Sequence, residues 1–433
     1  MTETDYLIEV HEGVAAVEAA DWDALLAAQA HPTPFMRHAY LRALEASGSI
    51  GGDTGWQPVV LTVRQRDGGD LVAAASAYLK MHSYGEYVFD WAWADAYRRY
   101  GVPYYPKLLV AVPFTPVPGS RLLARDAHAR VLLLRALGAL ARESGCSSVH
   151  LLFGDEADYA AARECGWMMR QGVQFHWHNR HDTAAEGATP IVLPYADFAD
   201  FLAGLQRDKR KKIAQERRRV GEAGVTFETL EGEHIDQAAW DFFHACYRNT
   251  YAEHHSTPYL TRDFFARMQA TMAGHWVMFV ASRADPAGAR PAAPERAGLS
   301  PSGAGSAASR VAVKRVACSL IAVDRTAGAA FGRYWGALEH IPNVHFEACY
   351  YQPLQWCIAN RFRRFEGGAQ GEHKMARGLM PARTQSAHWI AEPEFARAIG
   401  SHLRQESGSI DEYLSELDDR SPFKAPKDEE PSQ

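Results

Sequence analysis

The stretch from Tyr334 to Gly378 constrains the fold most strongly, because it reads as strand, helix, short strand and glycine-rich turn in quick succession. A glycine-bounded aromatic segment, Tyr334 to Gly336, leads into a strand-like run at 344–350 and then a helix at about 352–359. A basic and aromatic run at 361–365 then meets three glycines. This order predicts an α/β fold of mixed sheets, with titratable groups concentrated where the pattern ends.

The bulk composition is that of a globular protein with a substantial core, since 47% of residues are hydrophobic and 23% are charged. A length of 433 residues suggests two domains of ordinary size. The net charge of -6 gives no general reason to expect nucleic acid or anionic membrane as a partner. The six cysteines form no CxxC pair, so we expect reduced thiols and a cytoplasmic location. We see neither a signal peptide nor a membrane-spanning run.

A small, polar segment at 181–190 is expected to link two domains, 1–185 and 186–417. Both repeat one layout of helices, an antiparallel pair of strands, further strands and a helix, which suggests a duplicated α/β fold. Residues 284–310 are rich in Ala, Gly, Pro and Ser and are predicted to be a disordered insertion in the second domain. The charged end of the chain, 418–433, is predicted to be a disordered tail.

Two segments are candidate phosphate sites. The helix expected at 207–219 carries eight lysines and arginines against Asp208 and Glu216, a local charge of +6 in an acidic chain. Such a face suits a polyanion, although a solvated helix face with internal ion pairs explains it equally well. The turn at 115–121 follows a buried strand and precedes a helix, which can aim backbone N–H groups at a phosphate, although an ordinary αβ turn is the favoured alternative. The candidate ligands are Lys209, Arg210, Lys211, Arg217, Thr115, Gly119 and Arg121.

Two further segments are candidate catalytic elements. Alternation in the strand expected at 345–351 places His345, Glu347 and Cys349 on one face, where Glu347 could act as a base, unless this is simply a solvent-facing edge. The turn at 367–374 combines glycines, which allow close backbone approach, with an amide, a carboxylate, an imidazole and an ammonium group. The alternative is that residues 367–374 form a polar β-turn with a structural role alone. The residues singled out in and near this turn are Trp335, Gly367, Gln370, Gly371, His373 and Lys374.

An unusually aromatic stretch at 84–105 is expected to belong to the core or to line a cleft for an extended substrate. The residues we expect to contact substrate there are Trp91, Asp95, Tyr105 and Lys107. Paired histidines at 176/178 and 254/255 have no third ligand nearby in the sequence, so no metal site is predicted.

These motifs resemble the FemAB-like acyltransferases, within the GNAT superfamily of N-acyltransferases. The resemblance rests on YWGALE, on HFEACYYQPLQWCIANRFRRFEGGAQGEHK, and on SYGEYVFDWAW, YYPKLLVAVPFTPVPG and KRKKIAQERRR. It implies two tandem GNAT-like domains. In the family, FemAB proteins move amino acids from aminoacyl-tRNA to the stem peptide of peptidoglycan precursors, and ordinary GNAT enzymes use acetyl-CoA. The sequence lacks both the coiled-coil arm of some members and a clear glycine-rich CoA loop.

The resemblance therefore implies transfer of an acyl or aminoacyl group to a small-molecule or peptide amine. Acyl-CoA or aminoacyl-tRNA would be the co-substrate, and no cofactor would be tightly bound. We expect Glu347 or His373 to be the base, with strand or turn amides stabilising the oxyanion and Tyr334 or Tyr351 protonating the leaving group. Two alternatives are a non-catalytic module that recognises peptide or cell-wall fragments and a nucleic-acid protein that uses the basic helix. The sequence leaves donor, acceptor and oligomeric state open.

Overall fold

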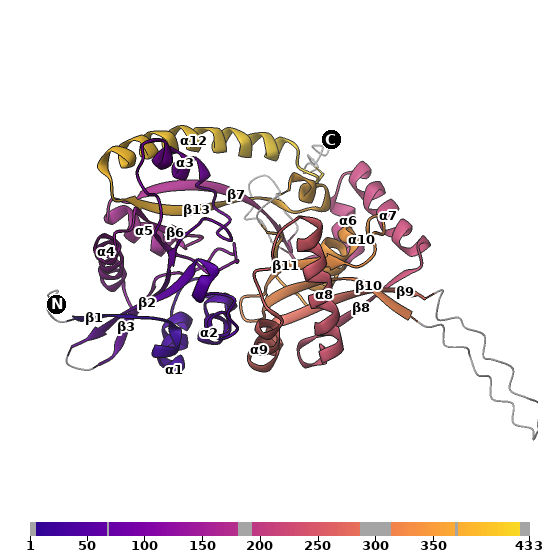
Figure 1. Cartoon of the computed structure of the whole chain (residues 1–433). Coiled ribbons are helices and arrows are strands. Elements are labelled where there is room, and N and C mark those ends of the chain that lie inside the picture. Colours follow the sequence, from indigo (N-terminus) through magenta and orange to yellow (C-terminus); the bar gives the residue numbers. More distant parts are fainter. Residues whose placement is uncertain (1–5, 67–68, 181–192, 286–312, 369–370, 425–433) are drawn as a thin grey trace, which may run out of the picture.

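The computed structural model describes residues 6–66, 69–180, 193–285, 313–368 and 371–424. In these residues one thirteen-stranded mixed sheet runs through the whole molecule, in the order β1-β2-β3-β4-β6-β13-β7-β12-β11-β10-β9-β8, and β5 pairs with β3 (Figure 1). The strands are β1 Tyr6–His11, β2 Trp56–Gln65, β3 Leu71–Lys80, β4 Lys107–Val110, β5 Leu123–Ala124, β6 Ser148–Leu152, β7 Met168–His178, β8 Val225–Glu231, β9 Trp276–Ala284, β10 Val313–Asp324, β11 Ala329–Ala337, β12 Arg364–Glu366 and β13 Met380–Ile390. The expected α/β class is confirmed.

The helices cover both faces of this sheet. They are α1 Ala19–Ala27, α2 His38–Ala46, α3 Trp91–Arg99, α4 Ala127–Glu143, α5 Glu156–Glu164, α6 Phe198–Gly204, α7 Arg207–Glu222, α8 Gln237–Glu253, α9 Arg262–Met272, α10 Val344–Phe346, α11 Gln352–Ala359 and α12 Pro393–Asp419. Acidic N-caps begin several of them, and Asp155 and Asp158 form a full capping box on α5. Figure 1 shows the long α12 lying along β7 and β13.

The predicted duplication appears in the strand topology. In the first half, β1 to β4 are antiparallel neighbours and β4 pairs parallel with β6. In the second half, β8 to β11 repeat this arrangement and β11 pairs parallel with β12. The last strand of each half is exchanged, because β13 pairs with β6 and β7 pairs with β12. β7 and β13 also pair with each other, so the two halves share the centre of one sheet.

The hydrophobic core also crosses between the halves. Phe35 lies against Phe331 with ring centroids 5.3 Å apart, and Tyr40 lies against Phe264 at 5.5 Å, both in edge-on geometry. Three predicted segments lie outside the described residues: the linker at 181–190, the insertion except for residues 284–285, and the tail from 425 onward. The tail was predicted to begin at residue 418, but α12 continues to Asp419 and Phe423 forms a β-bridge with Leu205.

The strand predicted at 344–350 is wrong, because this segment is helical. A short α10 leads into a π-helix, Glu347–Tyr351, which continues as α11. Pro353 explains the wide turn, since its ring has no N–H and would collide with the carbonyl four residues earlier in a regular helix. The alternation inferred for His345, Glu347 and Cys349 therefore does not put them on one face.

Candidate functional site

A wedge-shaped opening forms where β11 and β12 separate. The two strands pair in parallel only from Ala329 and Arg364 to Phe331 and Glu366. β12 then ends, while β11 continues to Ala337 with β10 as its only partner among the described strands. Backbone groups along this edge of β11 have no partner strand, and diverging strand ends of this kind are a common place for ligands in α/β proteins.

Two cavities open onto the wedge and share the lining residues Gly332, Arg333, Tyr334, Trp335 and Gly367. The larger, which we call the aromatic cavity, has a volume of about 600 Å³. Its walls come from the 83–91 loop of the first half and from α8 and β11 of the second. The aromatic lining residues are Tyr84, Tyr87, Phe89, Trp91, Phe114, Tyr247, Tyr251, Tyr259, Tyr334 and Trp335.

The smaller, which we call the basic cavity, has a volume of about 300 Å³ and contains His345, Cys349, Tyr350, His373 and Lys374. The Tyr350 hydroxyl lies 3.1 Å from His373 Nε2, and Lys374 Nζ donates to the Gly368 carbonyl at 3.1 Å. Burial lowers the pKa of Lys374 to about 8. Desolvation and the charges of Arg377 and Lys374 lower the pKa of His373, so its imidazole is neutral at pH 7. None of the described residues that line either cavity is Asp or Glu.

Much of the predicted glycine turn thus lies at the wedge. Tyr334, Trp335, Gly367, His373 and Lys374 line the basic cavity, although they come from three separate elements. Gly371 has φ +109°, and a Cβ there would lie 2.4 Å from the His373 ring, so glycine is required for this ring position. Gln370 lies outside the described residues. Of the four residues predicted to contact substrate in and after the aromatic stretch, Trp91 lines the aromatic cavity.

Glu347 and Tyr351 lie away from both cavities. Arg217 Nε lies 3.1 Å from each carboxylate oxygen of Glu347, and Gln352 Nε2 donates to the same group at 2.7 Å. The Tyr351 hydroxyl donates to Glu216. Both side chains are buried and line none of the described cavities, so they connect α7 to the helical segment behind the basic cavity.

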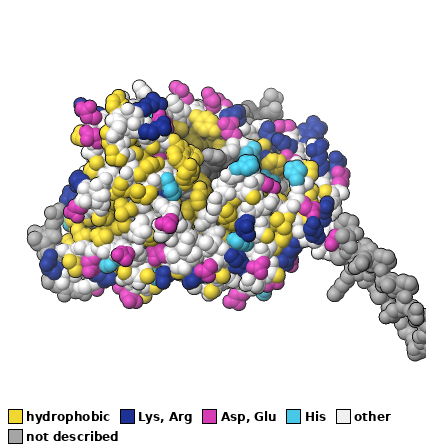
Figure 2. Space-filling model, in the orientation of Figure 1, with side chains coloured by type: hydrophobic (Ala, Val, Ile, Leu, Met, Phe, Trp, Pro, Cys, Tyr) yellow, Lys and Arg dark blue, Asp and Glu magenta, His cyan; other side chains and the backbone are white. Residues whose placement is uncertain are grey.

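The basic helix is only partly available to a ligand. Lys209 pairs with Asp208 at 2.8 Å, and Arg210 donates to the Leu205 carbonyl at 2.7 Å. Lys211 and Lys212 are exposed, and the charge of Lys212 contributes to lowering the pKa of His373. Basic side chains gather over α7 in Figure 2, beside the hollow between the two halves. α7 therefore packs against the segment that carries His373 and Lys374, although none of its described residues lines the basic cavity itself.

The turn at 115–121 has a structural role. It follows β4 at the position that corresponds to the wedge in the first half, and almost every residue from 107 to 124 is buried. Arg121 donates to the carbonyls of Gly119, at 3.1 Å, and Val117, and Thr115 donates to Pro113 at 2.9 Å. Most of the turn's polar groups are therefore used in contacts within the protein, although Pro118 and Gly119 line a separate cavity of about 310 Å³ beside Gly154 and Asp155.

Three other predicted substrate contacts have partners within the protein. Asp95 pairs with Arg98 and Arg99, and the Tyr105 hydroxyl lies 2.9 Å from Ser83 Oγ. Asp95 and Tyr105 also line, together with Trp91, a separate open cavity of about 660 Å³. Lys107 is fully buried and donates to Ser83 and Glu86, each at 2.8 Å, and to Asp90. These contacts hold the base of the 83–91 loop, so Lys107 supports the wall of the aromatic cavity from behind.

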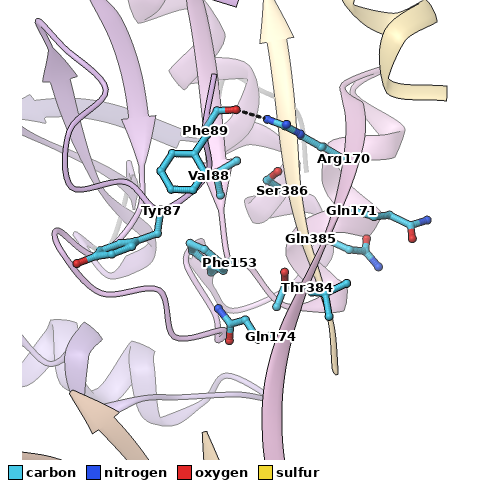
Figure 3. A pocket seen from close by; sticks show the side chains of 12 residues that line it. Tyr87, Val88, Phe89, Phe153, Arg170, Gln171, Gln174, Thr384, Gln385 and Ser386 are labelled. Carbon is cyan, nitrogen blue, oxygen red and sulfur yellow. Dashed lines mark hydrogen bonds between the residues drawn. The ribbon is translucent and has the colours of Figure 1, made fainter. Parts of the chain in front are cut away.

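A third cavity, of about 200 Å³, lies beside β7 and β13 where these strands pair (Figure 3). It shares Tyr87 and Phe89 with the aromatic cavity. Phe153, Thr384 and Ser386 lie between the 87–89 loop and β7 in Figure 3, and Arg170 donates to the Phe89 carbonyl at 2.7 Å. The third cavity therefore adjoins the aromatic cavity at the 87–89 loop, and the aromatic cavity adjoins the basic cavity at the wedge.

Sequence reasoning missed Arg333 and the aromatic side chains of α8, including Tyr247 and Tyr251. A four-residue spacing of tyrosines in a helix is usually a core pattern, so it gave no reason to expect a cavity wall. Arg333 was detectable as an isolated charge in an otherwise apolar strand.

A protein-family model described as peptidoglycan biosynthesis/recognition, FemAB-like, matches residues 13–290 and 306–425. Among solved structures, the chain is similar to L-PGS from Bacillus licheniformis (11% identity, 91% of this chain and 99% of that chain, TM-score 0.49). It is also similar to FemX (10% identity, 90% and 100%, TM-score 0.48) and to a tandem GNAT protein from the clavulanic acid biosynthesis pathway (12% identity, 90% and 99%, TM-score 0.40). No curated protein matches the sequence. No helix in the described parts of the chain is both long and apolar enough to cross a membrane.

Proposed function

This chain belongs to the FemAB-like family, and from that premise we propose that it is an N-acyltransferase that works at the wedge between β11 and β12. It moves an acyl or aminoacyl group from an activated donor, acyl-CoA or aminoacyl-tRNA, to an amine. The observation that carries this proposal is the basic cavity, where a neutral imidazole and a buried ammonium group lie beside an unpaired strand edge. A peptide of a peptidoglycan precursor is the acceptor that the family description favours.

The chemistry needs a base for the amine, and His373 fits this role better than Glu347. When His373 Nε2–H donates to the Tyr350 oxygen, Nδ1 carries the lone pair that can take the proton. Glu347 is instead neutralised by Arg217 and lines no described cavity. A neutral imidazole at pH 7 is the form that general-base catalysis requires.

The attacked carbonyl develops negative charge, which preorganised donors must stabilise. Lys374, whose pKa of about 8 keeps it mainly protonated at pH 7, and backbone N–H groups on the open edge of β11 are the donors within reach of the cavity. Tyr334 lines both cavities and can protonate the leaving group. Lys211 and Lys212 on the adjacent face of α7 would attract the phosphates of the donor.

The test begins with acetyl-CoA, longer acyl-CoAs and aminoacyl-tRNA as donors and amine-bearing peptides as acceptors. With the productive pair, His373→Ala should lower turnover by about 10²-fold or more, while His234→Ala, an exposed histidine on the same half, should leave it unchanged. Wild-type activity should rise with pH below about 6.5, as His373 loses its proton, because its pKa lies below the ordinary value. That rise should be absent in His373→Ala. Near-normal turnover in this variant would exclude His373 as the base.

A second candidate function is recognition of a peptide without catalysis. The observation that favours it is that the cavity of Figure 3 shares Tyr87 and Phe89 with the aromatic cavity and offers amide and hydroxyl side chains to an extended chain. Peptide binding with no transfer from any donor would support this alternative.

A further inference from the structure

Arg333 occupies the point where the aromatic and basic cavities meet. It lies on β11, just beyond the last residue that pairs with β12, and its side chain lines both cavities. All the hydrogen bonds that Arg333 donates to described residues come from one nitrogen, Nη2. Their acceptors are the Phe114 carbonyl at 2.8 Å, Thr115 Oγ1 at 3.0 Å and the Tyr334 hydroxyl at 3.2 Å. These contacts hold the guanidinium in place and leave Nη1 for another partner, since Nε is buried.

No carboxylate of the described residues balances the charge of Arg333. Among the residues that the structure describes, no Asp or Glu forms an ion pair with it, and its Nε is buried without a hydrogen-bond partner. Burial lowers the pKa of Arg333, while the neighbouring Tyr334, Tyr40 and Tyr87 raise it, and the net shift is upward. By contrast, the buried Arg377 pairs with Glu216 at 2.9 Å. Leaving a desolvated guanidinium unpaired is costly, so an anion from outside the protein is the partner that would offset this cost.

The residues around Arg333 indicate which class of anion would bind there. Ten aromatic side chains line the aromatic cavity, and no carboxylate among the described lining residues of either cavity would repel a negative ligand. Arg333 is itself held against aromatic faces, with Tyr334 at 5.0 Å and Phe35 at 5.2 Å from its guanidinium carbon. A carboxylate next to an apolar or aromatic group matches this combination, because Nη1 can donate a charge-assisted hydrogen bond to it while the aromatic side chains contact the apolar group.

We propose that Arg333 binds a carboxylate of the acceptor, and that the acceptor is an amine whose apolar or aromatic side chain packs in the aromatic cavity. The amino group then faces His373 in the basic cavity. This assignment rests on the proposed function for the identity of the reacting group, but the carboxylate site can be tested by binding alone. Arg333 is thus a specificity-determining residue, which selects a carboxylate-bearing acceptor over the same molecule as an amide.

The experiment measures binding of alanyl-phenylalanine and of its C-terminal amide to the full chain, without any donor. Trp91 and Trp335 line the aromatic cavity, so quenching of tryptophan fluorescence reports occupancy, and thermal shift provides an independent readout. We expect the acid to bind at least tenfold more tightly than the amide, and alanyl-alanine to bind more weakly than alanyl-phenylalanine. Inorganic phosphate should not compete at equal concentration.

Arg333→Met should bind acid and amide equally, and Arg333→Lys should retain part of the preference. Arg325→Met is the matched control, since Arg325 lies on the same β10–β11 hairpin but is exposed and paired with Glu231 at 3.0 Å. Equal binding of acid and amide by the wild type, a preference that survives in folded Arg333→Met, or displacement by phosphate would overturn the proposal. The wild-type comparison and Arg333→Lys still decide it if Arg333→Met does not fold.

The result of this binding experiment does not depend on whether the protein transfers an acyl group. A clear acid preference in a protein that transfers no acyl group would support the carboxylate site and contradict the catalytic proposal. Transfer to amide acceptors as fast as to acid acceptors would support the catalytic proposal and contradict the carboxylate site.

Discussion

Glu216 shows how one buried acid organises the back of the basic cavity. It is a negative residue within the basic helix α7, and it accepts from Arg377 Nη2 at 2.9 and 3.0 Å and from the Tyr351 hydroxyl. Arg377 in turn donates to the His373 carbonyl at 2.7 Å. The position of His373 therefore depends on a charge pair that sequence reading counted only as part of a helix's net charge.

Replacing Glu216 with Ala should lower the free energy of unfolding by about 3–5 kcal/mol, because Arg377 would stay buried without its counterion. Glu222→Ala is the control, since Glu222 pairs with Arg218 on the exposed end of the same helix and should cost less than about 1 kcal/mol. Urea denaturation measures both. Equal losses in the two variants would show that the buried pair contributes no more than a surface pair.

At the scale of elements, β11 is held in position by α8 where β12 no longer accompanies it. Asn249 Nδ2 donates to the Ala337 carbonyl at 2.8 Å, and Thr250 Oγ1 donates to the Trp335 carbonyl at 3.0 Å. Gly336 permits this approach, because a Cβ there would lie 2.3 Å from the Cys246 carbonyl oxygen. The close packing of helix on strand fixes Tyr334 and Trp335 at the wedge.

Gly336→Ala should therefore push α8 away from β11 and cost about 1–3 kcal/mol of stability, as overpacking usually does. Gly221→Ala is the matched control: Gly221 lies in α7 with open space around its Cβ, and the change should stabilise by up to about 1 kcal/mol. Thermal unfolding of both variants provides the comparison. Unchanged stability in Gly336→Ala would mean that α8 can shift at no cost.

For the whole molecule, the exchange of β7 and β13 joins the two halves more firmly than contact between separate domains would. Each half completes its own sheet with a strand from the other, and the aromatic core continues across the boundary through Phe35 and Phe331. The wedge is built by both halves, since the first half contributes the 83–91 loop to the aromatic cavity. Neither half offers the complete site alone.

The chain should consequently unfold in one cooperative transition rather than two. Far-ultraviolet circular dichroism and tryptophan fluorescence should give the same midpoint, and the calorimetric and van't Hoff enthalpies should agree. Glu216→Ala, a change in the second half, should shift both signals together. Two resolved transitions, with only one moved by that substitution, would mean that the halves unfold independently despite their exchanged strands.

Local patterns were enough to predict the α/β class, the duplication and the concentration of Tyr334, Trp335, His373 and Lys374 beside one cavity. These features follow from hydrophobic periodicity, glycine placement and side-chain chemistry, which act over a few residues. The helical form of 344–351 was missed because alternation over seven residues cannot reveal a π-turn accommodating Pro353.

The availability of each charged group was decided only by tertiary contacts. Glu347 meets Arg217, which is 130 residues away, and Lys107 meets Glu86 across 21 residues, so neither is available to a ligand. Arg333, which sequence reading passed over, ends with no acid beside it among the described residues. A charge becomes a binding group when folding removes water without supplying a counterion, and that depends on which distant segments the sheet brings together.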